Sequence, residues 1–283
     1  MTFSASWLAL REPYDIAARN PDVLAAVVAA LADRASVGVV DLASGSGSTP
    51  RAIASSLPSR QRWRLLDHDS GLLALAARSA PVEGRELLTV PLDIAREIET
   101  AFDEPVDLVT ASALLDLVSA EWLERLAVEV IERDLIFYAA LSYDGRIEFK
   151  PSDPFDIAMI EAVNRHQRSD KGFGPALGPE AAAATILRFE SAGCKVVHGP
   201  SDWRLGRQDR EIQTELVEGW AAAAKDGGNP ETAEIDGWLA RRREHIALGR
   251  SSLRVGHTDL FVTSIGRRRA VRSQSNSTSP SSG

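Results

Sequence analysis

One strand-like stretch and the small residues after it constrain the fold more than any other part of the chain. Residues 37–42, VGVVDL, are typical of a buried strand, and residues 43–47, ASGSG, follow it directly. A second strand-like run, residues 63–66, ends at Asp67, 20 positions beyond Gly47. This spacing of a small-residue loop and a later carboxylate is typical of a nucleotide-binding α/β unit.

The loop also indicates the kind of ligand. Small side chains leave backbone amides uncovered, so a ligand can approach them closely. We expect Ser48 or Thr49 to cap the next helix, with Pro50 in its first turn. Asp67 would then accept hydrogen bonds from both hydroxyls of a ribose, so we predict an adenosine-like ligand.

The spacing of the glycines separates two kinds of nucleoside. A dinucleotide fingerprint has a third glycine where this chain has Pro50. By contrast, residues 41–47, DLASGSG, resemble the first motif, D-x-G-x-G-x-G, of class I S-adenosylmethionine-dependent methyltransferases. Ala43 replaces the first glycine of that motif.

The resemblance continues from Val37 to Gly266 and implies a fold. The family places an acidic residue after the third strand near the adenine amine, where this chain has Asp93 followed by Ile94. A fourth strand over 106–112 leads into a helical segment around 121–126. The implied fold is an α/β, Rossmann-like three-layer sandwich with a seven-stranded, mostly parallel sheet. Its last strand is antiparallel, and a helical insertion precedes that strand.

The resemblance further implies S-adenosylmethionine as cofactor. Arg11 would pair with the methionyl carboxylate and Tyr14 would cover the sulfonium, although a plain packing role for Tyr14 is an alternative. The expected cofactor-binding residues are Arg11, Asp41, Ala43, Gly45, Gly47, Asp67, His68, Asp93, Ile94 and Ser112.

Further elements follow from local signals. Asn20 is expected to cap a helix beginning at Pro21. A fifth strand over 135–141 is followed by a predicted hairpin turn at 143–146 and a short strand at 147–149. The remaining expected elements are a helix over 179–192 ended by Gly193 and two final strands over 195–198 and 259–264.

The chain divides into three expected parts. Residues 1–36 form a helical cap segment, 37–266 the methyltransferase domain, and 267–283 a disordered tail. Within the domain we expect a substrate-side loop over 151–177 and a helical insertion over 209–249. The insertion could cover the substrate pocket, but a packing pair of helices is the preferred interpretation.

The 151–177 loop carries candidate substrate contacts. Arg165, Arg168 and Lys171 could hold a carboxylate or phosphate, and the alternative is a solvated surface loop. Methyl transfer requires mainly alignment and desolvation, with a base only where the acceptor keeps its proton. Asp116 and His166 are the candidate bases, against the alternatives of a helix N-terminal charge and a solvated histidine. No spacing of ligands suggests a metal site.

Composition limits the partners. With 40 acidic and 32 basic residues the net charge is −8, which disfavours nucleic acid, so we expect a small-molecule substrate. The single cysteine, Cys194, is expected to be buried, and its lack of a partner fits a reducing compartment. The first residues show no basic region followed by an apolar core, so we expect no secretion signal, and residues 23–31 are too short to span a bilayer. A cytoplasmic monomer or homodimer is predicted.

Three functions remain open from the sequence. The first is a small-molecule methyltransferase that uses S-adenosylmethionine. The second is a nicotinamide-dependent oxidoreductase, against which the missing third glycine argues. The third is a non-catalytic relative that keeps the fold and the cofactor.

Overall fold

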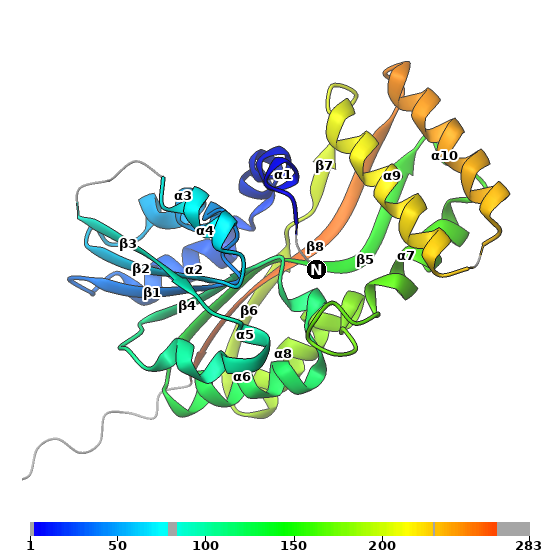
Figure 1. Ribbon diagram of the computed structural model, residues 1–283. Coiled ribbons are helices and arrows are strands. Elements are labelled where there is room, and N and C mark those ends of the chain that lie inside the picture. Colours follow the sequence, from blue (N-terminus) through cyan, green and yellow to red (C-terminus); the bar gives the residue numbers. More distant parts are fainter. Residues whose placement is uncertain (1–2, 79–83, 229, 265–283) are drawn as a thin grey trace, which may run out of the picture.

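The computed structural model describes residues 3–78, 84–228 and 230–264 (Figure 1), so the predicted tail over 267–283 lies outside the described residues. Within them the chain forms one eight-stranded sheet flanked by helices. The strands are β1 (Val37–Leu42), β2 (Gln61–Asp67), β3 (Arg85–Pro91), β4 (Leu108–Ser112), β5 (Ile136–Lys150), β6 (Cys194–Pro200), β7 (Trp203–Leu205) and β8 (Ser252–Ser264). The α-helices are α1 (Ala5–Ala18), α2 (Pro21–Leu31), α3 (Ser48–Ile53), α4 (Ser70–Ala76), α5 (Ile94–Glu97), α6 (Ala120–Glu132), α7 (Asp156–Gln167), α8 (Ala181–Ser191), α9 (Arg210–Asp226) and α10 (Thr232–Ala247).

The sheet has the expected Rossmann-like arrangement. Its order is β3-β2-β1-β4-β5-β8-β6, in which the first five strands run parallel and β8 is antiparallel to both β5 and β6. The predicted fold class is therefore confirmed. The strand count needs a correction from seven to eight, because the short strand β7 also pairs with β8.

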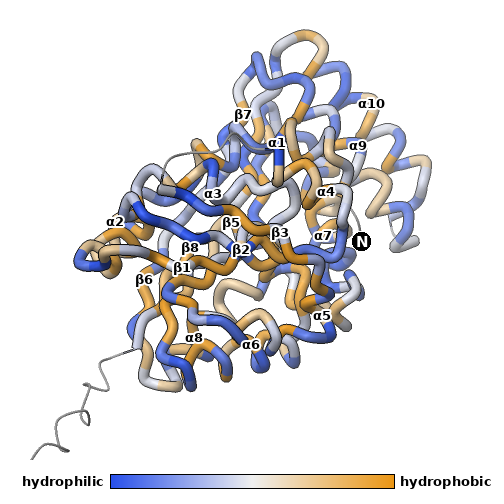
Figure 2. Tube along the Cα trace, turned by 60° about the vertical axis from the view of Figure 1, so that its left-hand side comes forward, coloured by the Kyte–Doolittle hydropathy of each residue, from blue (hydrophilic) through white to orange (hydrophobic). Residues whose placement is uncertain are grey.

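Alternation along the strands builds the three layers. In β1, Val37 and Val39 face a core shared with α2, α3 and α4, whereas Val40 and Leu42 face a second core shared with α6 and α8. Successive strand residues point to opposite faces, so a strand covered on both sides is apolar throughout. Figure 2 shows this concentration of hydrophobic residues along the central strands.

The predicted helix starts are partly confirmed. The Asn20 side chain caps α2, accepting hydrogen bonds from the amides of Asp22 and Val23 at 3.1 Å. The prediction for α3 was wrong, because Ser48 and Thr49 lie inside its first turn. Gly47 occupies the cap position with a φ of 78°, and no side chain caps this helix.

The predicted hairpin at 143–146 does not exist. β5 runs from Ile136 to Lys150 and pairs along its length with β8, with irregularities between Ala139 and Ser142 and between Tyr143 and Ile147. The Asp144-Gly145 pair, which favours a turn in isolation, forms part of the second irregularity instead.

The extended halves of β5 and β8 carry a second lobe (Figure 1). With β7, α7, α9 and α10 they enclose a separate core that includes Phe149, Met159, Trp238 and Leu253. The predicted helical insertion thus contains α9 and α10, which pack within this lobe. The 151–177 segment, expected to be a loop, contains α7.

Candidate functional site

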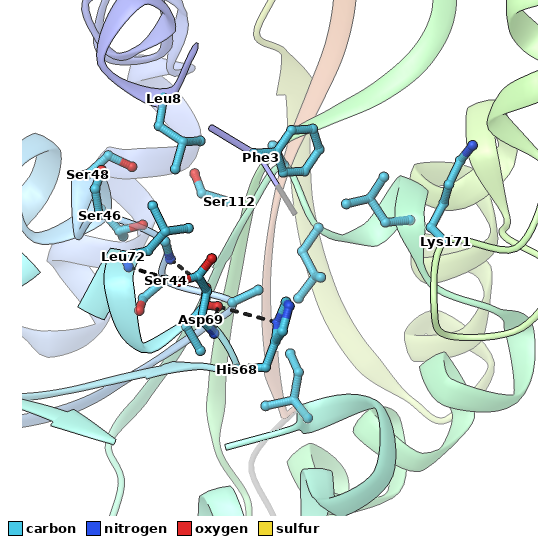
Figure 3. Close-up of a pocket in the computed structure, with 18 of the residues that line it drawn as sticks. Phe3, Leu8, Ser44, Ser46, Ser48, His68, Asp69, Leu72, Ser112 and Lys171 are labelled. Atoms are coloured by element: carbon cyan, nitrogen blue, oxygen red, sulfur yellow. Dashed lines mark hydrogen bonds and ion pairs between the residues drawn. The ribbon is translucent and has the colours of Figure 1, made fainter. Parts of the chain in front are cut away.

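The carboxyl ends of the parallel strands meet at a cavity of about 280 Å³. Ligands of doubly wound sheets bind at this edge, where the strand order reverses. Nine of the predicted site residues line the cavity: Arg11, Ala43, Gly45, Asp67, His68, Asp93, Ile94, Ser112 and Lys171. Figure 3 shows side chains from several elements around this space, with Ser46 and Ser48 on one side and Lys171 on the opposite side.

Asp67 connects the end of β2 to the glycine-containing loop. The Gly45 amide donates to Asp67 Oδ2 at 2.8 Å, and the Asp69 amide donates to Oδ1 at 2.9 Å. His68 Nδ1 lies 3.4 Å from the same Oδ1. A carboxylate has about four acceptor positions, so two backbone bonds leave capacity for two hydroxyl donors of a ligand. The carboxylate is held in place before any ligand arrives.

Two alanines at the strand ends adopt a left-handed backbone. Ala43 after β1 has a φ of 50° and Ala113 after β4 a φ of 51°, and both line the cavity. Residues with a Cβ rarely adopt these backbone angles, so both conformations are strained. Ala43 takes this conformation at the position where the motif that the loop resembles has glycine, a residue that adopts it without strain. Residues in such conformations cluster at binding sites.

Asp41 lies beneath the loop and outside the cavity lining. Its side chain is fully buried, and Thr110 Oγ1 donates to its Oδ1 at 2.7 Å. Burial raises the pKa of Asp41 to about 7, although hydrogen bonds from Thr110 and Thr49 oppose the rise. No described group donates to its Oδ2. The Asp41 carboxylate therefore contacts β4 through Thr110 and does not face the cavity. Gly47 also lies outside the cavity lining, as the cap of α3.

The remaining strand-end residues differ in their exposure. The exposed Asp93 accepts a hydrogen bond from the Ala95 amide at 3.1 Å and lies 3.5 Å from Arg96 in an ion pair. Ile94 is buried and presents an apolar wall. Ser112 Oγ accepts a hydrogen bond from the buried Arg19 at 2.8 Å.

Helix α1 covers the cavity from the N-terminal side. Phe3, Leu8, Arg11 and Asp15 all contribute to the cavity wall, and Figure 3 shows Leu8 and Phe3 above the space. Glu12 on the same helix forms a bidentate ion pair with Arg51 of α3, at 2.6 and 2.7 Å. Arg51 also donates to the backbone carbonyl of Ser46, so this ion pair fastens α1 to the loop.

Arg11 faces the cavity but already has a partner. Its guanidinium donates to both oxygens of Asp15, at 2.9 and 3.1 Å, and lies 5.0 Å from the ring centre of Trp203. Tyr14 points elsewhere, because its hydroxyl donates to Asp209 at 3.0 Å outside this cavity. The expected position of Tyr14 over a sulfonium is therefore corrected to the packing alternative.

The candidate substrate contacts of the 151–177 segment are spread apart. Lys171 lines the cavity and donates to the carbonyl of His166 and to Ser169 Oγ, at 3.0 and 2.8 Å. His166 contributes no cavity wall, and burial beside the positive charge of Lys171 lowers its pKa. Arg168 forms an ion pair with Glu180 on the surface, and Arg165 is exposed. The structure thus brings only Lys171 of these four residues to the cavity.

A second cavity of about 360 Å³ adjoins the first, and sequence reasoning did not predict it. The two share four wall residues: Phe3, Arg11, Ala113 and Leu117. Asp116 lies in the second cavity with only 6% of its surface exposed. Burial raises the pKa of Asp116 to about 6, and the nearby charge of Arg11 opposes part of the rise.

Comparisons with known proteins add little to this geometry. No protein-family model matches the chain, and no curated protein matches its sequence. Three similar solved structures are the YcgJ protein of Bacillus subtilis and S-adenosylmethionine-dependent methyltransferases from Geobacter sulfurreducens and Thiobacillus denitrificans, the last two holding S-adenosylhomocysteine. Their sequence identities are 14%, 13% and 18%, and their TM-scores are 0.48, 0.47 and 0.45. They cover 87%, 92% and 93% of this chain and 100%, 98% and 100% of their own. With TM-scores below 0.5, the case for function rests on the site itself.

The described residues hold neither a helix that could span a membrane nor a cluster of metal ligands. No helix among them has both the length and the apolar composition needed to cross a bilayer. The same part of the chain holds no group of three or more histidine, cysteine or acidic side chains that could bind a metal ion. Cys194 is buried as expected and pairs with no other cysteine.

Proposed function

We propose that this protein is an S-adenosylmethionine-dependent methyltransferase acting on a small-molecule acceptor. The observation that carries the proposal is the position of Asp67 at the end of β2. Its carboxylate is fixed by the Gly45 amide at 2.8 Å and borders the cavity at the switch point of the sheet. A carboxylate in this place suits the two hydroxyls of a ribose.

Each part of the cofactor has a candidate partner. Asp67 would accept hydrogen bonds from the ribose hydroxyls, and Asp93 would accept one from the adenine amine. Ile94 would pack against the purine ring. Arg11 would bind the methionyl carboxylate by giving up one of its two hydrogen bonds to Asp15. Asp41 would support the loop from beneath. When bound, the cofactor supplies a methyl carbon activated by the adjacent sulfonium charge.

The chain's remaining role is alignment and exclusion of water. Methyl transfer is an in-line displacement, which gains most from holding the two reactants in order. Helix α1 closes the cofactor cavity, and the second cavity opens from it beside Ala113 and Leu117. An acceptor in the second cavity would therefore lie next to the cofactor. The volume of about 360 Å³ fits a small molecule.

The alternatives receive less support. The dinucleotide fingerprint has a third glycine that lets the helix pack closely on the sheet, and this chain has the buried Pro50 at that position. A non-catalytic relative would keep the cofactor cavity without an acceptor site, whereas a second cavity with a buried carboxylate adjoins it here. A cytoplasmic location and a monomeric or homodimeric state remain predictions.

Calorimetric titration with S-adenosylmethionine, S-adenosylhomocysteine and NADH tests the proposal. We expect the first two to bind and NADH not to bind. Asp67→Ala should weaken binding at least tenfold, because it removes charge-assisted hydrogen bonds worth about 1.5–3 kcal/mol each. Asp33→Ala, at an exposed position away from the cavity, is the control. Binding of NADH alone, or unchanged affinity in Asp67→Ala, would refute the cofactor assignment.

A further inference from the structure

The second cavity has aromatic walls contributed by distant parts of the chain. Trp7 comes from α1, Trp203 from β7 and Trp220 from α9, and Tyr143 and His257 come from the facing strands β5 and β8. Trp7 and Trp203 pack edge to face, with ring centres 6.4 Å apart. The faces of aromatic rings attract cations, most strongly those of tryptophan. Arg11 already lies 5.0 Å from the ring centre of Trp203, so the tryptophans left for a ligand are Trp7 and Trp220, and they suit one that is both apolar and positively charged.

The acidic groups of this cavity also favour a positively charged ligand. Asp116 is buried, and no described group donates a hydrogen bond to its Oδ1. Glu215 of α9 lies at the exposed rim. The single arginine in the walls, Arg11, already donates to both oxygens of Asp15. An acidic group on a ligand would be repelled by the Asp116 carboxylate, whose charge Arg11 and the Tyr143 amide offset only in part, whereas a positively charged donor would satisfy its Oδ1.

The other polar groups are occupied or neutral. The Tyr143 hydroxyl donates to Asn164 Oδ1 at 2.7 Å. Burial lowers the pKa of His257 to about 3, with Arg11 and Arg146 adding to the effect and Asp202 opposing it. The imidazole is therefore neutral near pH 7. Asp116 is the buried acid of the cavity, and a pKa of about 6 leaves most of it deprotonated at that pH.

We propose that the second cavity binds a primary or secondary amine carried on an aromatic or apolar body, and that Asp116 holds its ammonium group next to the cofactor. The inference rests on the proposed function, since it names the acceptor class of the same site. The aromatic walls select the body of the ligand and the charge, and the unsatisfied Oδ1 receives an N–H donor.

The transfer step balances with the groups present. The Asp116 carboxylate takes one proton from the ammonium, which frees the nitrogen lone pair. The nitrogen then forms a bond to the methyl carbon, and the carbon–sulfur bond breaks with its electron pair going to sulfur. The products are an N-methylated ammonium ion and the neutral thioether, and the proton on Asp116 leaves to solvent as the product departs. In this step Asp116 is a catalytic residue, because it contacts the reacting nitrogen.

Three ligands of one shape test the charge preference. Phenethylamine, phenethyl alcohol and 3-phenylpropionate share the ring and differ in the charge of the end group. They are titrated into full-length protein saturated with S-adenosylhomocysteine, and the tryptophan fluorescence of the cavity walls is followed alongside the heat. We expect the amine to bind at least tenfold more tightly than either analogue. Its affinity should fall as the pH drops below about 6, where Asp116 becomes protonated.

Asp116→Asn is the decisive variant, because it keeps the shape of the side chain and removes the charge. It should lose the preference for the amine by at least tenfold and lose the pH dependence, while S-adenosylhomocysteine still binds. Asp33→Asn, on the exposed surface, is the matched control and should retain both. Incubation with S-adenosylmethionine should then give the N-methylated amine in the unchanged protein.

The outcomes separate the two proposals. Failure of S-adenosylhomocysteine to bind would overturn the proposed function, and amine selectivity measured without it would still report on the cavity. Binding of S-adenosylhomocysteine combined with equal binding of all three ligands would overturn only the amine assignment. Absence of amine binding at millimolar concentration, or a preference unchanged in Asp116→Asn, would overturn it equally.

Discussion

Arg11 forms a bidentate ion pair with Asp15 one turn further along α1, at 2.9 and 3.1 Å, and lies in the walls of both cavities. Trp203 fixes the pair from the second lobe, since its ring nitrogen donates to Asp15 Oδ1 at 3.0 Å. One helix thus contributes a single charged group to two neighbouring binding spaces.

Substitution of Arg11 tests its contact with the cofactor. Arg11→Ala should weaken S-adenosylhomocysteine about tenfold, because a charge-assisted hydrogen bond to the methionyl carboxylate is lost. Adenosine, which lacks that carboxylate, should bind with unchanged affinity, and Arg11→Lys should restore part of the loss. Calorimetry measures all three. Equal affinity for S-adenosylhomocysteine in Arg11→Ala would remove Arg11 from the cofactor site.

The ion pair between Glu12 and Arg51 should control how long the cofactor stays bound. Glu12→Gln removes the charge that fastens α1 to the loop, and partly exposed pairs of this kind contribute about 0.2–1 kcal/mol. We expect S-adenosylhomocysteine to dissociate two- to fivefold faster in stopped-flow displacement, with little change in thermal stability. Glu86→Gln, at an exposed position on β3, serves as control. A dissociation rate equal to that of the unmodified chain would argue against this role for the ion pair.

Ala43 should be a site where glycine stabilises the protein. Its φ of 50° is strained for a residue with a Cβ, so Ala43→Gly should raise the free energy of unfolding by up to about 1 kcal/mol. The same substitution at Ala30, inside α2, should lower it by about 0.5–1 kcal/mol. Urea denaturation of both variants measures whether each substitution raises or lowers the free energy of unfolding. A lower free energy of unfolding in Ala43→Gly would contradict the claim that the Ala43 backbone is strained.

His257 should make the protein less stable in mild acid. Its pKa falls from an ordinary 6.5 to about 3 on burial, so the unfolded chain binds a proton that the folded chain does not between those values. This contribution to stability is complete above pH 6.5 and is lost as the pH falls toward 3, by about 1.4 kcal/mol per pH unit. His257→Gln should therefore lose less stability than the unmodified protein between pH 7 and pH 5 in urea denaturation. His198→Gln, at an exposed position, should follow the unmodified protein.

Asp259 should be among the most sensitive positions of the fold. It is fully buried on β8 and accepts hydrogen bonds from the Asn20 and Leu141 amides, at 2.9 and 2.8 Å, and from the Tyr138 hydroxyl at 3.2 Å. Asp259→Ala leaves these donors unsatisfied and should cost about 3–5 kcal/mol of stability. Asp259→Asn, which keeps one acceptor oxygen, should cost less. Near-equal melting temperatures for Asp259→Ala and the unmodified protein would show that these hydrogen bonds do not stabilise the fold.

Local patterns predicted the parallel half of the sheet well. The small-residue loop after Val37–Leu42 and the carboxylate at Asp67 lie together because each directly ends a strand. The same argument placed Asp93 and Ser112 at one edge. Alternating helices and strands predict a parallel sheet. The position of a binding site can then be predicted too, because such sites lie at the carboxyl ends of the strands.

Long-range pairing decided the parts that the sequence did not predict. The Asp144-Gly145 pair has the local preference of a hairpin turn, but pairing with β8 continues the strand on both sides of it. β7 has only three residues, too few for a periodic signal. The second cavity combines Trp7, Asp116 and Trp220 from three distant segments, so no local spacing could reveal it.

Residues of β5 and β8 line the second cavity, whereas the wall of the first contains none of them. Both strands run from the parallel sheet into the second lobe, and the second cavity lies beside their middle, at Leu141, Tyr143, Val255 and His257. Helix α9 lines the second cavity but not the first, so substitutions in α9 should leave the loop between β1 and α3 untouched. Under the proposed function, we expect changes in this helix to alter the choice of acceptor while the source of the methyl group stays the same.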